Sequence, residues 1–147
     1  MNLNEFHEKI ALRNAEVFAN NKHAKVTAAL AVISEIGEMC NAVVGLLGCE
    51  QRKAHLTKGD VLDGIGDACV YLSILARLSG VIDLEEAYEK CEPVPAGYAE
   101  PEVLALNVAR GVAVSVGSMA SVAHDPMEIN ERTGRLFRGL ERVALAF

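Results

Sequence analysis

Apolar residues recur at intervals of three and four along most of the chain, a spacing typical of amphipathic α-helices. In residues 2–19, for example, Leu3, Phe6, Ile10 and Val17 define the apolar side of a predicted helix. The alternation of apolar and polar residues that half-buried β-strands show is almost absent, and no Asn-Gly hairpin turn occurs. The pattern therefore predicts an all-α fold.

Residues that cap helices mark where the predicted helices begin. A polar residue is followed three positions later by Glu or Asp at Asn2, Thr57 and Asp83, and Asp125 directly precedes a proline. Glycines follow the second and third predicted helices, where they favour a helix end. These signals predict helices over about residues 2–19, 25–47, 57–79, 83–90, 101–122 and 125–147.

The only stretch rich in proline and glycine, residues 92–100, divides the chain into residues 1–91 and 101–147. Ile36-Gly37-Glu38-Met39 in the first part resembles Val116-Gly117-Ser118-Met119 in the second. Two interpretations stay open: an internally duplicated two-helix unit, or a chance match between helices of similar composition. In either case, 147 residues suffice for a single domain with a four-helix-bundle core and flanking helices.

Composition and charge narrow the class of protein. The chain is 51% apolar with a net charge of −6, which argues against the basic surface that nucleic-acid binding requires. Acidic residues interrupt the longest apolar stretches and no secretory signal is visible, so we expect no membrane span and no secretion. The four cysteines lack the spacing of a zinc site. We therefore expect a cytoplasmic protein with reduced thiols.

Four acidic residues interrupt two otherwise apolar predicted helices. Glu35 and Glu38 are three residues apart, and Asp63 and Asp67 are four residues apart, so each pair shares one helix face. If the two helices pack antiparallel with these faces opposed, the four carboxylates converge. Carboxylate oxygens are ligands that Mg²⁺ and Mn²⁺ prefer. The alternative interpretation is an ordinary acidic surface that binds nothing.

The surroundings of these acids favour a metal site. Residues 26–51 and 59–76 contain no lysine or arginine, so neither acidic pair has a compensating cation at helical spacing. Gly37, Gly64 and Gly66 stand beside the acids, although each glycine costs up to about 1 kcal/mol inside a helix. We expect these glycines to let the helices, or a ligand, approach closely.

The segments that carry these acids resemble the MazG-type nucleotide pyrophosphohydrolases. The resemblance rests on Ser34-Glu35-Ile36-Gly37-Glu38-Met39 and on the segment from Gly59 to Leu72. This all-α superfamily also includes the dimeric dUTPases and the phosphoribosyl-ATP pyrophosphohydrolases. Its signature is E-E-x-x-E, a spacer and E-x-x-D, on two antiparallel helices that bind Mg²⁺. The resemblance covers residues 1–91.

The resemblance implies a metal-dependent enzyme of the house-cleaning type. Such an enzyme cleaves a nucleoside triphosphate between the α and β phosphates, giving a monophosphate and pyrophosphate. Glu35, Glu38 and Asp67 match the metal ligands, with Asp63 as the nearest carboxylate for the remaining position. Glu35 or Glu38 is the candidate catalytic base, and Mg²⁺, or else Mn²⁺, the cofactor. The resemblance further implies a homodimer or a higher homo-oligomer.

Two residues depart from the signature. Ser34 stands in place of the first glutamate of the E-E pair, and Gly64 stands in place of the glutamate of E-x-x-D. Asp63 has a shorter side chain than that glutamate and lies one position earlier. These departures define the alternative function, a catalytically weakened or inactive MazG-like helical protein that binds nucleotide or mediates oligomeric interaction.

Further residues are candidates for binding the substrate. Lysines could contact its phosphates, and polar or aromatic residues near the acids or on the first helix could contact its base. The candidates are Lys53, Lys58, Lys90, Asn41, Tyr71 and His7. Each has the alternative interpretation of an ordinary surface or packing residue.

The second half lacks acids where a duplication would place them. Alignment of the two halves puts Ser115, Ser118, Arg138 and Arg142 opposite the four acids of the first half. Together with Arg135, the two arginines share a helix face that could attract an anion, unless it is an exposed face balanced by neighbouring glutamates. The second half is therefore interpreted as a degenerate copy, if it is a copy.

Overall fold

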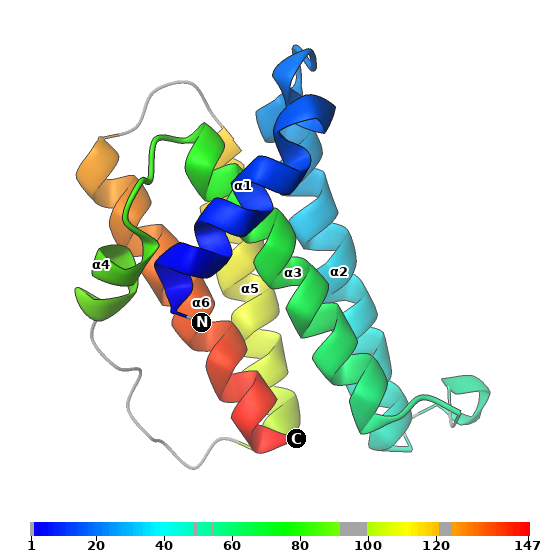
Figure 1. The fold of residues 1–147 in the computed structure, drawn as a ribbon. Helices are drawn as coiled ribbons and strands as arrows, with labels where there is room; N and C mark the ends of the chain where they lie inside the picture. The colour runs from blue at the N-terminus through cyan, green and yellow to red at the C-terminus, as the bar shows by residue number, and fades with distance from the viewer. Residues whose placement is uncertain (1, 49, 54, 92–99, 121–124) are drawn as a thin grey trace.

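The computed structural model describes residues 2–48, 50–53, 55–91, 100–120 and 125–147. Within these residues it contains six α-helices, one 3₁₀ turn and no strand, which confirms the predicted all-α fold (Figure 1). The helices are α1 (Leu3–Ala19), α2 (Ala24–Leu46), α3 (Lys58–Leu78), α4 (Leu84–Glu89), α5 (Pro101–Ala120) and α6 (Pro126–Ala146), and the 3₁₀ turn is η1 (Gln51–Lys53).

Four of the helices form a bundle. α2 packs against α3 and α5, and α6 packs against the same two helices, so that α2 and α6 occupy opposite corners. The short helix α4 packs on α6, and α1 lies across α3 and α4 outside the bundle (Figure 1). Both parts of the chain, residues 1–91 and 101–147, therefore contribute two helices to one bundle.

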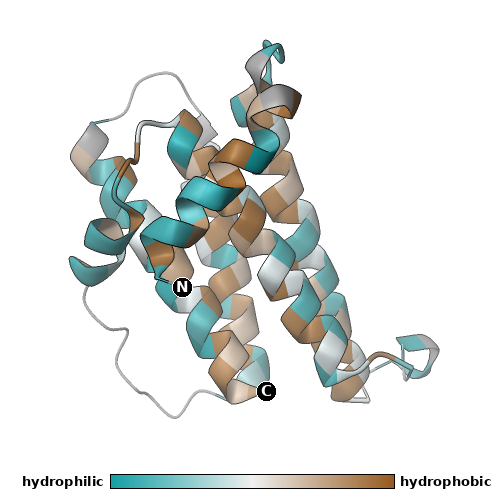
Figure 2. Cartoon of the chain, in the orientation of Figure 1, coloured by the Kyte–Doolittle hydropathy of each residue, from teal (hydrophilic) through white to brown (hydrophobic). Residues whose placement is uncertain are grey.

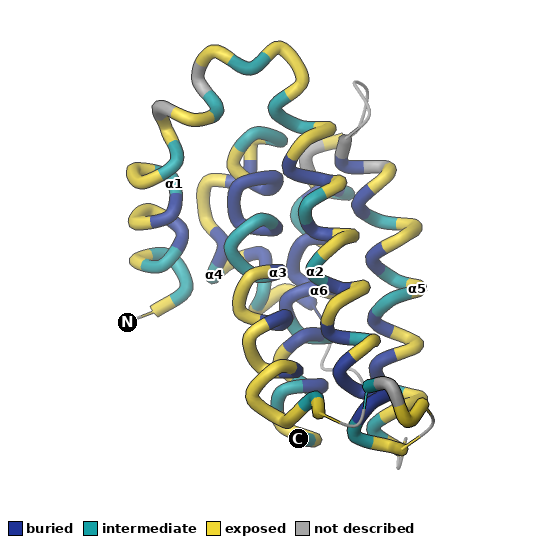
Figure 3. Tube along the Cα trace, turned by 90° about the vertical axis from the view of Figure 1, so that its right-hand side faces the viewer, coloured by how far each residue is buried: buried dark blue, intermediate teal, exposed yellow. Residues whose placement is uncertain are grey.

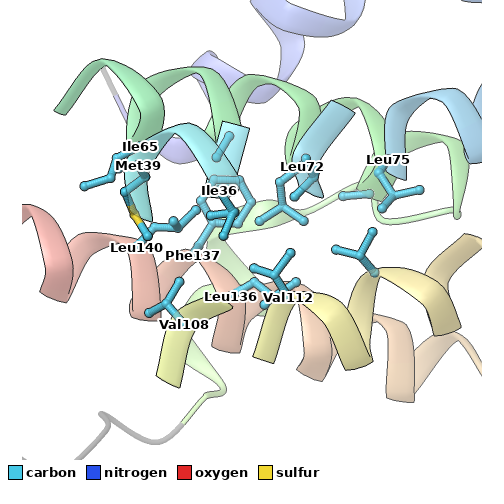
Figure 4. Packing of buried hydrophobic residues seen from close by; sticks show 14 of the residues in the cluster. Ile36, Met39, Ile65, Leu72, Leu75, Val108, Val112, Leu136, Phe137 and Leu140 are labelled. Carbon is cyan, nitrogen blue, oxygen red and sulfur yellow. The ribbon is translucent and has the colours of Figure 1, made fainter. Parts of the chain in front are cut away.

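The core lies between these four helices. Ile36 and Met39 of α2, Leu72 of α3, Val112 of α5 and Leu140 of α6 are buried and meet at the centre (Figure 4). Buried positions recur on one side of each bundle helix (Figure 3), as expected for helices that bury one face. Burial of apolar surface at about 25 cal/mol per Å² is the main stabilising contribution.

The predicted caps are present. Asn2 and Glu5 form a reciprocal capping box at the start of α1, and Thr57 and Asp60 do the same for α3. Asp83 accepts a hydrogen bond from the Glu86 backbone N–H, which caps α4. The predicted helix boundaries are confirmed within a few residues. The predicted linker and the expected end of the fifth helix lie in residues 92–99 and 121–122, outside the described residues.

One predicted apolar position on the first helix is wrong. Val17 is 67% exposed rather than buried. The face of α1 that packs against the bundle carries His7, Ile10, Asn14 and Phe18, which follow one another at intervals of three or four residues. Val17 lies about 100° around the helix from Phe18 and so points away from that face.

α2 is long and apolar enough to cross a membrane by length and composition alone, the one such helix in the described part of the chain. In the structure it packs against α3 and α5, and a core helix of this kind meets the same criteria. The expectation that the chain does not enter a membrane therefore stays a prediction.

Candidate functional site

The two acidic pairs lie on neighbouring helices. α2 and α3 run antiparallel (Figure 1) and touch where Gly64 packs on Met39. Counting along the two helices from this contact places Glu35 level with Asp67. The helix register therefore brings the two acidic pairs to the same level, and their convergence on one ion stays a prediction.

The four carboxylates act on one another. Burial raises the pKa of Glu35, and the negative charges of Glu38, Asp67 and Asp63 raise it further, in that order. Glu35 is half-buried, whereas the other three are exposed. None of the four forms a hydrogen bond or ion pair with any residue that the structure describes. Within the described part of the chain, no cationic side chain is therefore paired to these four carboxylates.

The donor chemistry of this face fits a hard divalent cation, because all four groups are carboxylates. The side chains as placed do not form a ligand cage. Among the described residues, no group of three or more His, Cys, Asp or Glu side chains is arranged to hold a metal ion. Metal binding would require the exposed carboxylates of Glu38, Asp63 and Asp67 to rotate toward Glu35.

The three glycines beside the acids differ in their surroundings. A Cβ atom added at Gly64 would lie 3.0 Å from the Met39 backbone nitrogen, so this glycine lets α3 approach α2 closely. Cβ atoms added at Gly37 and Gly66 would meet no atom within 4 Å. The expectation of close helix approach is therefore confirmed at Gly64 alone, and the other two glycines leave open space beside the carboxylates.

The α3 face that carries Asp67 continues toward a separate cavity under α1, which none of the four acids lines. On α3, Asp67 is followed at helical spacing by Tyr71, Ile74 and Leu78, which share its face. Ile74 and Leu78 line a cavity of about 700 Å³ whose other walls come from α1 and the start of α2. This volume suits a small organic molecule. Sequence analysis did not find this cavity, because it depends on how α1 lies across the bundle.

The cavity is mainly apolar with a few polar groups. Leu12 and Phe18 contribute apolar walls from α1, and the side chains of Asn14 and Asn21 lie among them. Arg77, at the end of α3, adds a guanidinium group and forms no hydrogen bond or ion pair with the described residues. Apolar walls with a few polar groups are typical of a ligand site.

The candidate phosphate-binding lysines are all engaged with protein groups. The Nζ atom of Lys53 donates to the Asn41 Oδ1 atom at 2.8 Å and lies 3.0 Å from Glu50. Asn41 follows Glu38 by one helical turn, so Lys53 lies at the end of the acidic face. The other two lysines are elsewhere: Lys58 donates to the Phe147 carbonyl, and Lys90 pairs with Glu86 on α4.

His7 and Tyr71 differ in their access to a ligand. The His7 ring is buried, with Nδ1 2.7 Å from Ser73 Oγ and Nε2 3.1 Å from the Val81 carbonyl oxygen. Both of its ring nitrogens are therefore occupied by protein groups, which favours the packing interpretation. Tyr71 is half-buried one turn after Asp67, between the acidic face and the cavity under α1.

The arginines of the second half do not form one anion-binding stripe. Arg138 stacks on the Tyr88 ring, with its guanidinium carbon 4.0 Å from the ring centre, and donates to the Tyr88 carbonyl. Ser115, which the alignment of the two halves puts opposite Glu35, lines a cavity together with Arg132 and Arg135. The side chain of Ser118 lies outside the described part of the structure.

Comparison of this chain with protein-family models, with curated proteins and with solved structures gave no match. The resemblance to the MazG-type enzymes therefore rests on the motif residues of the sequence alone.

Proposed function

We propose that this protein is a metal-dependent nucleotide pyrophosphohydrolase, which cleaves nucleoside triphosphates between the α and β phosphates. One observation carries the proposal: burial and three carboxylates from two helices raise the pKa of Glu35, with no described cation paired to any of the four acids. A divalent cation bound at this face would relieve that repulsion and meet the oxygen ligands that Mg²⁺ and Mn²⁺ prefer.

The acids have distinct roles in this proposal. Glu35, Glu38, Asp63 and Asp67 would hold the cation, which neutralises phosphate oxygens and lowers the pKa of bound water. Glu35 is assigned as the base that accepts a proton from the attacking water at a carboxylate oxygen. It is the least exposed of the four.

The cavity under α1, which is separate from the acidic face, has room for a sugar and base. Asp67 and Ile74 are seven residues apart on α3, which is about 10 Å along a helix. Phosphates at the acidic face would therefore place a sugar and base near the cavity under α1, where the Asn14 and Asn21 amide groups donate to the Ile10 carbonyl and the Thr27 hydroxyl. Lys53, held by Asn41 beside Glu38, supplies positive charge near the phosphates.

The test is release of pyrophosphate from a panel of ribo- and deoxyribonucleoside triphosphates with Mg²⁺ or Mn²⁺. We expect turnover by the native chain and loss of about 100-fold or more in Glu35→Gln, since a catalytic base contributes about 10²–10⁴-fold. Glu102→Gln, which removes an exposed acid on α5, is the matched control and should keep full activity. Absence of pyrophosphate from every nucleotide would overturn the proposal.

A specific observation favours a second candidate function, a protein that binds nucleotide without hydrolysing it. The described carboxylates do not form a ligand cage, and Gly64 occupies a packed position where no glutamate fits. This function predicts that a non-hydrolysable triphosphate analogue binds in the presence of Mg²⁺ while pyrophosphate release stays at the uncatalysed rate. Substitution of a residue that lines the cavity under α1, such as Asn14→Ala, would then weaken binding of the analogue.

Self-association is also proposed. Val26, Leu30 and Ile33 lie on one face of α2 at intervals of four and three residues, and all three are exposed by 44% or more. The helices carry hydrophobic residues at many positions (Figure 2), and these three are exposed at the surface. A contiguous exposed apolar face favours association. Light scattering should give the mass of a dimer or larger assembly, and Leu30→Glu should shift it toward 15.7 kDa, the mass of the monomer.

A further inference from the structure

A second cavity, of about 600 Å³, lies between α5 and α6, on the half of the chain that lacks the acidic pairs. Three arginines line it: Arg110 from α5, and Arg132 and Arg135 from α6. Asn107 and Ser115 of α5 add an amide and a hydroxyl group. The cavity therefore gathers guanidinium groups from two helices together with neutral groups that can donate hydrogen bonds.

The charges of these arginines are only partly compensated. Arg132 pairs with Glu128 at 2.5 Å, and Arg135 pairs with Glu131, each four residues earlier on α6. Arg110 forms no hydrogen bond or ion pair with the described residues. Three arginines and two glutamates leave one net positive charge at the cavity.

The two ion pairs leave their arginines available to a ligand. The side chains of Arg135 and Glu131 are 69% and 55% exposed, and those of Arg132 and Glu128 are 28% and 42% exposed. Ion pairs between exposed residues four apart on a helix contribute only about 0.3–0.5 kcal/mol. A stronger anion can therefore share or replace the glutamates at little cost.

We propose that the α5–α6 cavity binds a small molecule that carries a phosphate group. Guanidinium groups form paired hydrogen bonds with phosphate oxygens, and the one net positive charge of the cavity attracts an anion. Arg110 is the central residue because no group that the structure describes pairs with it. The cavity is large enough to hold the remainder of a nucleotide-sized molecule, with Val114 and Gly111 as apolar wall.

This inference does not depend on the proposed hydrolase activity. None of the four acids of the α2–α3 face lines the α5–α6 cavity, and arginines need no metal ion to bind phosphate. Binding measured in EDTA therefore reports on the α5–α6 cavity, whether or not the acidic face binds a metal.

The test is isothermal titration of the full chain with inorganic pyrophosphate in EDTA at low ionic strength. We expect the native chain to bind and Arg110→Gln to bind at least about tenfold more weakly, because a charge-assisted hydrogen bond contributes about 1.5–3 kcal/mol. Arg142→Gln is the matched control, since Arg142 lies on α6 but does not line the cavity, and it should bind as the native chain does.

Three results would overturn the inference. The first is absence of binding by the native chain, and the second is equal binding by the native chain and Arg110→Gln. The third is binding that is lost in Lys53→Gln but kept in Arg110→Gln, which would place the anion at the end of the acidic face. Thermal unfolding of each variant checks folding, and substitution of the exposed Arg110 should change stability by less than about 0.5 kcal/mol.

Discussion

Gly64 of α3 packs directly on Met39 of α2, so closely that an added Cβ atom would lie 3.0 Å from the Met39 nitrogen and 3.2 Å from its Cα atom. This contact sets the register in which Glu35 and Asp67 lie level. It also explains why the glutamate of the MazG-type signature has no room at position 64. The outward carboxylate of this turn is that of Asp63, the residue before the glycine.

The Gly64 contact predicts opposite results at adjacent positions. Gly64→Glu should lower the free energy of unfolding by about 1–3 kcal/mol because it overpacks the α2–α3 interface. The buried charge should lower it further. Asp63→Glu should change stability by less than about 0.5 kcal/mol, since Asp63 is exposed. It lengthens the carboxylate arm and should increase the rise in Tm that Mg²⁺ causes. Urea unfolding with and without Mg²⁺ checks both; a stable Gly64→Glu variant would contradict the packing argument.

Gly134 makes the tightest contact between α6 and α4. A Cβ atom there would lie 2.0 Å from the Ala87 carbonyl oxygen and 2.6 Å from the Cys91 sulfur. Gly134→Ala should therefore lower the free energy of unfolding by about 1–3 kcal/mol. Gly117→Ala on α5 is the control, because its Cβ meets nothing within 4 Å, and it should stabilise by about 0.5–1 kcal/mol. Chemical unfolding measures both; equal effects would contradict the account.

His7 should make stability depend on pH. Burial lowers the pKa of His7 below 6.5, with a smaller contribution from Arg77, while its hydrogen bond to Val81 opposes the shift. The folded state therefore binds this proton less readily than the unfolded state, and stability is lost as pH falls through about 6.5.

The variant His7→Gln isolates this effect. At pH 8 it should be less stable than the native chain by about 1–3 kcal/mol, because the Ser73 hydroxyl and the Val81 carbonyl lose a buried partner. The difference in the free energy of unfolding should be smaller at pH 5, because only the native chain contains a buried histidine whose protonation favours unfolding. Denaturant unfolding of both proteins at the two pH values measures this. A stability difference that is the same at pH 8 and pH 5 would contradict the pH dependence assigned to His7.

Glu35→Gln should stabilise the protein when no divalent cation is present. The raised pKa of Glu35 means that its ionised form is disfavoured by folding, so stability falls as pH rises above the ordinary glutamate value of 4.5. Removing the charge at pH 7 in EDTA should gain a few tenths of a kcal/mol from relieved repulsion. Mg²⁺ should then raise the Tm of the native chain but not that of the variant. A loss of stability in EDTA would contradict the repulsion.

The features of the fold that can be predicted from the sequence are those set by interactions between residues close together in the chain. The capping box of Thr57 and Asp60 forms between residues three apart, and Glu35 and Glu38 share a face because of helix geometry alone. Each depends only on the helix to which it belongs. The helix starts and the two acidic faces could therefore be predicted before any tertiary contact was known.

Features that depend on contacts between residues far apart in the sequence could not be predicted. Cys91 lies outside any apolar run, yet it is buried and donates to the Glu131 carbonyl, 40 residues away. Arg138 does not join the expected arginine stripe, because it stacks on Tyr88, 50 residues earlier in the chain, and donates to its carbonyl. The cavity under α1 likewise exists because His7 anchors that helix to Ser73 of α3. These contacts are set by how helices dock, which periodicity and capping do not encode.

The proposed function requires that the carboxylates of α2 and α3 together bind a divalent cation. Its most direct test is an NMR titration with Mn²⁺, whose unpaired electrons broaden the amide signals of nearby residues. We predict that sub-stoichiometric Mn²⁺ broadens the signals of residues 34–39 and 63–68 first, and that Glu35→Gln abolishes this effect. No selective broadening there, or equal broadening around exposed acids such as Glu102, would contradict the claim.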